Sequence, residues 1–221
     1  MDDFWLQALS ILSATFRMAT PLVFAAMAGV FSERSGTIDI GLEGKMLAAA
    51  FASACVAVVT GSAWIALLGA VLVGVMMALL HGVACITYRG NQVVSGVAIN
   101  IIAAGLTLVL GNAWFGRGGQ TPDLTPDARF LPLRFPGWEE AASIPVLGPI
   151  YSFVIGGHNL LVYVAFLAVP LTWWVLYRTR FGLRLRAVGE DPKVVDTAGI
   201  SVTWLRYRAV ILAGVLCGFA G

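Results

Sequence analysis

Residues 46–88 read MLAAAFASACVAVVTGSAWIALLGAVLVGVMMALLHGVACITY, and this run contains no Asp, Glu, Lys or Arg. A bilayer core about 30 Å thick is crossed by about 20 apolar residues of helix, at about 1.5 Å per residue. The run is therefore long enough for two spans, and Thr60-Gly61-Ser62 interrupts it with residues typical of a turn. We expect a tight helical hairpin with spans over 46–60 and 63–87.

The same length criterion finds further spans on both sides of this hairpin. Residues 91–116 and 155–177 are each long and apolar enough to cross a membrane. Residues 12–31 form another candidate despite Arg17, whose long side chain can reach the headgroups from near one end of the span. The alternative for this first segment places residues 4–16 in the membrane interface, with the span starting after them.

The composition agrees with a membrane protein along the whole chain. Of the 221 residues, 59% are hydrophobic and 12% are charged, whereas a soluble domain carries about 25% charged residues. Residues 209–221 are apolar but too few to cross the membrane. We predict an all-α polytopic transmembrane bundle, a single domain over 1–221 with about five complete spans and a truncated sixth. On this reading the chain is a C-terminally incomplete piece of a longer protein.

The basic residues give the predicted orientation. Ten of the fourteen Lys and Arg fall on one side if residues 178–208 are cytoplasmic: seven in that stretch, with Arg34, Lys45 and Arg89. The positive-inside rule then favours an external N-terminus and an external segment over 114–157. That segment is rich in Gly and Pro, so we expect an irregular loop with one short interfacial helix. Its length favours contact with a soluble partner over a simple connector.

Neither a metal site nor a nucleic-acid interface is indicated. The net charge is only +2, and the cysteines at 55, 85 and 217 lack the spacing of a zinc site or a redox pair. One helical face in the second half of the hairpin instead carries small residues at strict four-residue spacing, which lets another backbone approach closely. We expect this stripe to be a helix-packing face; its members are Ala66, Ala70, Gly74, Ala78 and Gly82.

Polar residues in the third span are candidates for a solute path. Asn100 stands midway through 91–116, where an unpaired amide is costly. It either lines a polar path or links two helices. Asn91, Gln92 and Ser95 lie one to two turns away and serve either the path or ordinary interfacial solvation. Together with Glu43, these four are the candidate path residues.

The stretch between the first two spans, 35–46, is too broken for a regular membrane helix, and such backbone is tolerated only at the surface or beside a water-filled cavity. It is no phosphate-binding loop, because Leu42 stands where lysine is needed and Met46 follows Gly44-Lys45. Away from the span ends, the titratable candidates are His81 and His158, each expected near an interface. Secondary transporters usually carry ionisable groups inside their spans, so this pattern weakens that class.

The stretch 178–208 contains a short helix with signals at both ends. Asp191 suits an N-cap, Pro192 the first helical position and Gly199 the residue just past the end. We therefore expect a helix over 193–198, lying between two spans and projecting into the cytoplasm. It serves either as a docking element or as a connector.

Three blocks, 35–47, 91–100 and 181–200, together resemble the permease subunits of bacterial ABC importers for branched-chain amino acids, simple sugars and nucleosides. The first two blocks are most similar to the nucleoside and simple-sugar branch. The third is similar to the cytoplasmic loop whose short coupling helix sits in a groove of the ATPase subunit. The resemblance implies an ATPase-coupling surface made of Gly182, Arg184, Arg186, Gly189, Glu190, Asp191, Pro192, Lys193, Ala198 and Gly199, with Gly182 and Gly189 permitting sharp turns.

The resemblance also implies the partners and the activity. ATP and magnesium would be bound by separate cytoplasmic subunits, so this chain would be no enzyme and carry no cofactor. A second permease, identical or homologous, and an extracytoplasmic binding protein would complete the importer in a bacterial cytoplasmic membrane. The expected solute is a nucleoside first, a simple sugar second and a branched-chain amino acid third. The sequence departs from the family at Asp39, where asparagine is common, and at Val194-Val195, where alanines are usual.

Two other classes of membrane protein compete with this interpretation. The main alternative is an ATP-independent secondary transporter or channel. A membrane-embedded enzyme is disfavoured, because the sequence shows no paired intramembrane carboxylates and no His-Glu-x-x-His pattern.

Overall fold

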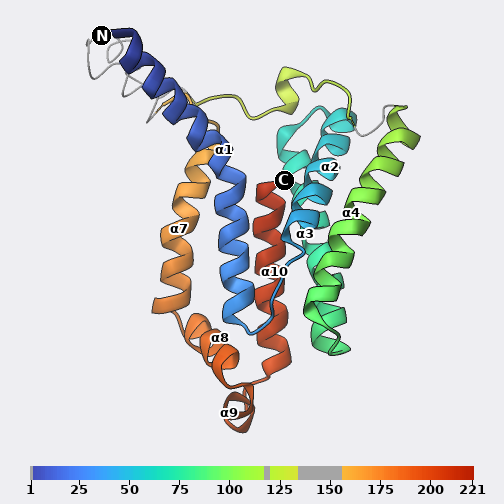
Figure 1. Cartoon of the computed structure of the whole chain (residues 1–221), viewed down its shortest axis with the longest axis vertical. Coiled ribbons are helices and arrows are strands. Elements are labelled where there is room, and N and C mark those ends of the chain that lie inside the picture. The colour runs from blue at the N-terminus through green and yellow to red at the C-terminus, as the bar shows by residue number, and fades with distance from the viewer. Residues whose placement is uncertain (1, 117–119, 134–155) are drawn as a thin grey trace.

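The computed structural model describes residues 2–116, 120–133 and 156–221, and these form an all-α bundle (Figure 1). Six of the described helices are long and apolar enough to cross a membrane, which confirms the predicted polytopic bundle. The long helices are α1 (Asp2–Arg34), α2 (Leu42–Thr60), α3 (Ala63–Gly82, continued by a π-helical turn Val83–Thr87), α4 (Gln92–Phe115), α7 (Leu160–Arg178) and α10 (Val202–Ala220). Shorter helices are a 3-10 turn (Pro126–Ala128), α8 (Arg180–Glu190) and α9 (Pro192–Thr197).

The predicted hairpin is confirmed. α2 ends at Thr60, Gly61 adopts the left-handed conformation at φ 64°, and α3 starts at Ala63. α4 also agrees with the predicted third span: the Asn91 side chain accepts hydrogen bonds from the backbone N–H groups of Val93 and Val94, and Gly116 ends the helix at φ 62°. Turn residues therefore mark these ends correctly, because glycine adopts positive φ without strain.

Two span boundaries need correction. α7 begins at Leu160 rather than at residue 155, because the backbone turns at Gly157, with φ 72°, and Asn159 pairs with Pro132 in an isolated bridge. α10 begins at Val202 rather than at residue 209. Its 19 residues extend about 28 Å at the standard rise, so the helix is long enough to cross a membrane.

The charges that suggested a later start for α10 are accommodated inside the helix. The Arg206 guanidinium donates to the Ser35 carbonyl at 3.2 Å, and Arg208 lies over the Trp204 ring at 4.8 Å. Arginine side chains can therefore occupy the first two turns of a span when a carbonyl or a ring receives them.

α10 packs between α1 and α3 (Figure 1), and its contact with α3 is the most extensive between the described helices. Four members of the predicted stripe, Ala70, Gly74, Ala78 and Gly82, lie on this contact, whereas Ala66 packs with Ala57 and Ala128. Ala66, Ala70 and Ala78 are buried, and a Cβ atom added at Gly74 would lie 2.5 Å from the Gly214 carbonyl oxygen. Without side chains at this point, the two backbones approach closely, as in other membrane helix pairs.

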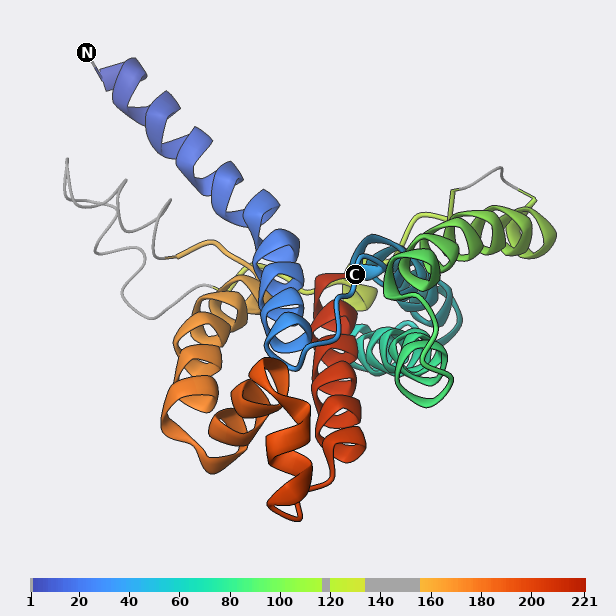
Figure 2. The ribbon, with the colours of Figure 1, turned by 60° about the horizontal axis from the view of Figure 1, so that its bottom comes forward.

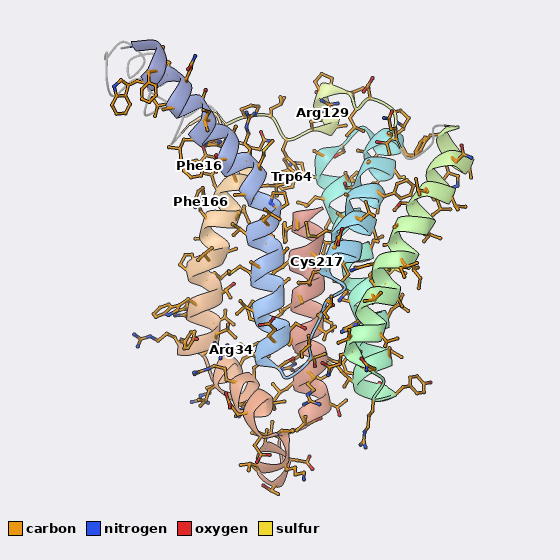
Figure 3. All side chains as sticks on the ribbon, viewed as in Figure 1. Phe16, Arg34, Trp64, Arg129, Phe166 and Cys217 are labelled. Atoms are coloured by element: carbon orange, nitrogen blue, oxygen red, sulfur yellow. The ribbon has the colours of Figure 1, made fainter. Side chains whose placement is uncertain are left out.

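α7 packs against α1 on the other side, and α4 packs mainly against α2. Near the external end in the predicted orientation, Phe16 of α1 meets Phe166 of α7 edge to face at 5.4 Å (Figure 3). α1 is one continuous helix of 33 residues, longer than the bilayer core requires, and its first half leans away from the other helices (Figure 2). Residues 4–16, for which an interfacial position was the alternative, belong to this leaning half.

Part of the predicted external segment 114–157 lies outside the described residues, namely 117–119 and 134–155. The described part, 120–133, crosses the ends of α2 and α3 (Figure 1) and contains the 3-10 turn. Ala128 is buried against Ala57 and Ala66, and Phe130 meets Trp64 edge to face at 5.2 Å. This part of the segment is therefore packed onto the bundle.

Candidate functional site

The segment 35–41, between α1 and α2, brings polar residues into the bundle interior. It has no helix, yet Ser35 and Thr37 are 0% and 1% exposed and Asp39 is also buried. It rises from the end of α1 alongside α10 before α2 begins (Figure 1). Broken backbone inside a membrane protein is tolerated where protein surrounds it or where it lines a cavity.

Side chains from several helices satisfy the backbone of this segment. The Ile38 N–H donates to the Gln92 side-chain oxygen at 2.6 Å, and the Asn100 amide donates to the Ile40 carbonyl at 3.2 Å. Ser32 donates to the Thr37 carbonyl at 2.6 Å. Because a buried unpaired backbone group costs about 1–3 kcal/mol, these bonds are what allow the chain to be irregular here.

Glycines let α4 approach the segment at two points. A Cβ atom added at Gly96 would lie 2.9 Å from the Gly41 nitrogen. One added at Gly44 would lie 2.7 Å from the Asn100 Cα atom, and the Gly44 N–H donates to the Asn100 side-chain oxygen at 2.7 Å. The start of α2 is thus fixed against α4 by close contact and by a hydrogen bond.

A buried ion pair lies beneath this contact. The Lys45 ammonium binds the Asp39 carboxylate, and both side chains are 0% exposed. The second Asp39 oxygen accepts the Gly41 N–H at 3.1 Å and lies 3.9 Å from His81 Nε2. His81 is itself buried, with its ring nitrogens 3.0 Å from the Ser95 hydroxyl and 3.2 Å from the Ile38 carbonyl.

This cluster corrects the expectation that ionisable groups stay near the interfaces. Lys45 was predicted to belong with the inner basic residues, and Asp39 stands where asparagine is common in the family, but both side chains are buried inside the bundle. Lys45 therefore no longer counts among the basic residues of the inner loops, on which the predicted orientation is based. A buried ion pair is tolerated only when the two charges contact each other and make further hydrogen bonds. The positions of charged residues along the sequence do not reveal such contacts. The argument against a secondary transporter from missing intramembrane charge no longer holds.

The predicted path residues of α4 are engaged with the protein itself. Asn91 caps α4, Gln92 and Asn100 bind the segment 35–41, and Ser95 binds His81. Asn100 therefore links two helices, which was one of its two expected roles. A role of these four residues in a solute path stays a prediction. Glu43, on the first turn of α2, differs from them because it is exposed and makes no hydrogen bond or ion pair within the described residues.

The predicted coupling surface forms one end of the molecule. α9 spans Pro192–Thr197, where a helix over 193–198 was expected, and the Asp191 side chain accepts the Lys193 N–H at 2.9 Å. Gly199 follows the helix at φ 74°, as its position predicted. α9 projects beyond the ends of the long helices (Figure 1), held by Val195, which is buried with Val188 and Leu205.

The preceding stretch forms a helix that the sequence reading missed. α8 starts after Thr179, whose hydroxyl accepts the Gly182 N–H at 3.1 Å, and it buries Leu185 and Val188. Spacing of three between Gly182, Leu185 and Val188 was the available signal for an amphipathic helix. The Arg186 guanidinium lies over the Tyr177 ring at 4.7 Å, while Arg184 and Glu190 are exposed.

Gly182 and Gly189 do not make the sharp turns that the resemblance implied. Both lie within α8, and neither has a positive φ. A Cβ atom on Gly182 would clash with the Val175 and Leu176 carbonyls, and one on Gly189 with the Arg34 carbonyl. Their role in the structure is close packing of α8 against α7 and against the end of α1, where Figure 3 labels Arg34.

Together, the six apolar helices and the buried polar segment define a multi-pass membrane protein. Residues 11–221 match the family of branched-chain amino acid transport system permease components. The chain belongs to this family.

Curated relatives extend the comparison. The chain is 40% identical over 225 residues to a guanosine ABC transporter permease of Bacillus subtilis, covering 97% of this chain and 67% of the relative. It is 36% identical to a nucleoside ABC transporter permease of Lactococcus lactis, covering 92% and 63%, and 35% identical to a putative glucose ABC transporter permease of Haloferax volcanii, covering 97% and 62%. The chain thus spans less than two thirds of the length of two of these relatives. No solved structure matches it.

Proposed function

We propose that this chain is a membrane-spanning permease subunit of an ATP-driven importer in a bacterial cytoplasmic membrane. The observation that carries the proposal is a capped helix, α9, that projects from one end of a bundle belonging to a permease family. The expected solute is a nucleoside, with a simple sugar second and a branched-chain amino acid third. The names of the relatives, which include guanosine, nucleoside and glucose permeases, support this order.

ATP and magnesium would be bound and ATP hydrolysed by separate cytoplasmic subunits docked on α8 and α9. Val194 supports this role, because it is 62% exposed on α9 and has the apolar surface that a partner groove would cover. A second permease subunit and an extracytoplasmic binding protein would complete the importer.

Packing contacts connect the proposed docking helix α9 to the interior of the bundle. α9 is fixed to α8 and α10 through Val195, and Gly189 of α8 contacts the backbone of Arg34 and Gly36. Arg206 of α10 holds Ser35 of the same segment. A displacement of α9 would therefore move the start of the polar segment 35–41. Alternating access requires two arrangements of the helices that have similar free energies.

Affinity purification from the native membrane tests the partner. We expect the full-length subunit to bring down an ATP-hydrolysing protein, and we expect that recovery to be lost when residues 192–197 are replaced by a Gly/Ser linker. A linker of equal length in place of residues 122–127, on the opposite end, is the matched control and should leave recovery intact. Recovery of the membrane protein alone, under conditions that preserve known transporter complexes, would contradict the proposal.

Sidedness is a separate prediction. In a background without native cysteines, Glu190→Cys and Lys193→Cys are expected to react with an impermeant thiol reagent only from the cytoplasmic side. Asp127→Cys, on the 3-10 turn, is expected to react only from outside, because the 3-10 turn and α9 lie at opposite ends of the long helices (Figure 1). The reverse labelling pattern would overturn the proposed orientation.

An ATP-independent transporter remains the second candidate, and the cluster of Asp39, Lys45 and His81 favours it, because buried ionisable groups are typical of ion-coupled transport. Solute uptake into vesicles separates the two. Uptake that requires ATP supports the importer, whereas uptake that persists without ATP and follows an ion gradient supports the second candidate.

A further inference from the structure

Glu43 is a carboxylate that makes no hydrogen bond or ion pair within the described part of the chain. It lies in the first turn of α2 and is exposed, whereas its neighbours Gly44 and Lys45 are buried. The other charges of this region, Asp39 and Lys45, bind each other. Glu43 is therefore the charged residue of the segment 35–46 that has no ion-pair partner within it.

The contacts of its neighbours show how far along the bundle axis Glu43 lies. The adjacent Gly44 contacts Asn100, which is eight residues into α4, or about 12 Å from the start of that helix. Leu42 packs on a cluster that includes Ala213 and Cys217, which lie eleven and fifteen residues into α10, or about 17–23 Å from its start. Both helices start at the same end of the molecule (Figure 1). With a bilayer core about 30 Å thick, Glu43 lies near its middle.

A charged carboxylate at this depth does not face lipid chains. Ionisable residues within membrane spans face the bundle interior or a water-filled cavity. Glu43 shares one face of α2 with Leu47, Ala50 and Ala54, at spacings of four, seven and eleven residues. This face is therefore turned toward water or toward a polar ligand.

The same three residues line a groove of about 410 Å³ between α2 and α4. Its opposite wall carries Ala104, Thr107 and Leu108, and Thr121 lies at the end where the chain leaves α4. In Figure 1, α2 and α4 diverge toward that end. The groove thus runs from the outer end of the helices toward the depth at which Glu43 stands.

We infer that this groove is the outer half of the solute path and that Glu43, one turn of α2 inward of the lining residue Leu47, accepts hydrogen bonds from the hydroxyl or N–H groups of a neutral solute. The inference rests on the importer function proposed above. An ionised carboxylate only accepts hydrogen bonds, so it suits the hydroxyls of a sugar or the hydroxyl and amino groups of a nucleoside. It repels a phosphate group, so the path selects nucleosides over nucleotides.

Small and apolar walls suit the rest of such a solute. The faces of a nucleobase or a sugar ring are apolar, and Ala50, Ala54 and Ala104 leave room beside the backbone. The groove hydroxyls at Thr107 and Thr121 supply further hydrogen bonds along the way. Tight binding is not needed on a path, where a solute must also leave.

Cysteine accessibility in the assembled complex tests the path. In the full-length subunit with its ATPase, lacking native cysteines, we expect Glu43→Cys and Ala50→Cys to react with a water-soluble methanethiosulfonate reagent. Saturating guanosine should slow both reactions about tenfold. Leu72→Cys, on the outward face of α3, is the control and should react slowly with or without guanosine. Cysteines at 43 and 50 that do not react, or react at a rate that guanosine leaves unchanged, overturn the inference.

Transport measurements test the carboxylate itself. We expect Glu43→Gln to raise the KM for guanosine uptake about tenfold, Glu43→Asp to restore most of the affinity, and both variants to retain their ATPase subunit. Unchanged uptake by Glu43→Gln would overturn the role of the carboxylate. Disulfide-linked dimers formed through Glu43→Cys, with no solute protection, would show that a second copy covers this face. If the unsubstituted subunit brings down no ATPase, the proposed function fails. If it does and only the position-43 results are negative, this inference alone fails.

Discussion

Lys45→Met is expected to lower the free energy of unfolding by about 3–5 kcal/mol, because it leaves the Asp39 carboxylate buried without its cation. The Gly41 N–H and the ring of His81 at 3.9 Å are the groups that remain beside it, and neither replaces an ammonium bound directly. Equilibrium unfolding of the purified subunit in detergent micelles measures the effect. Lys193→Met is the matched control; it removes the same charge from exposed α9 and is expected to change the free energy by less than about 0.5 kcal/mol.

The double variant Asp39→Asn, Lys45→Met separates the ion pair from the packing of the two side chains. We expect it to recover most of the loss, because no uncompensated charge stays in the interior. The difference between the double variant and the sum of the single variants gives the coupling between the two groups. A Lys45→Met protein as stable as the unsubstituted one would contradict the buried pair that the structure places beneath Gly44.

The spans were predictable because the bilayer leaves the chain few options. Each span must satisfy its backbone internally, so length, charge and the turn residues around Gly61 identified the hairpin, and length and charge identified the helix that Asn91 caps. Prediction failed where tertiary contacts overrode the charge pattern. The start of α10 was placed seven residues late, since nothing along the sequence indicates that the Ser35 carbonyl receives Arg206.

The candidate site was only partly predictable for the same reason. Asp191 and Gly199 act within one or two turns of their own position, so the local pattern gave both ends of α9. The Asp39–Lys45 pair depends on His81 and Ser95 from other helices, and its members looked like ordinary loop charges. The burial of Asp39 and Lys45, which follows from contacts with other helices, shows that both lie inside the bundle.

Gly74→Ala is expected to destabilise the bundle by about 1–3 kcal/mol, the usual cost of overpacking a close contact. The added Cβ would lie 2.5 Å from the Gly214 carbonyl oxygen and 3.0 Å from the Gly218 nitrogen. Both are backbone atoms, so no side chain can rotate to make room and the helices must separate. Equilibrium unfolding in detergent micelles measures this loss. Gly105→Ala is the control, because a Cβ there meets no atom within 4 Å; it is expected to be neutral or to stabilise by up to about 1 kcal/mol.

Gly218→Ala tests the same contact from α10, where the added Cβ would lie 2.5 Å from the Val71 Cα atom. We expect a similar loss, and a double variant less destabilised than the sum of the two single ones. The reason is that one methyl group already forces α3 and α10 apart, and the second then enters a contact that has opened. Full additivity would show that the two glycines act independently, and a neutral Gly74→Ala would contradict backbone contact as the basis of this helix pair.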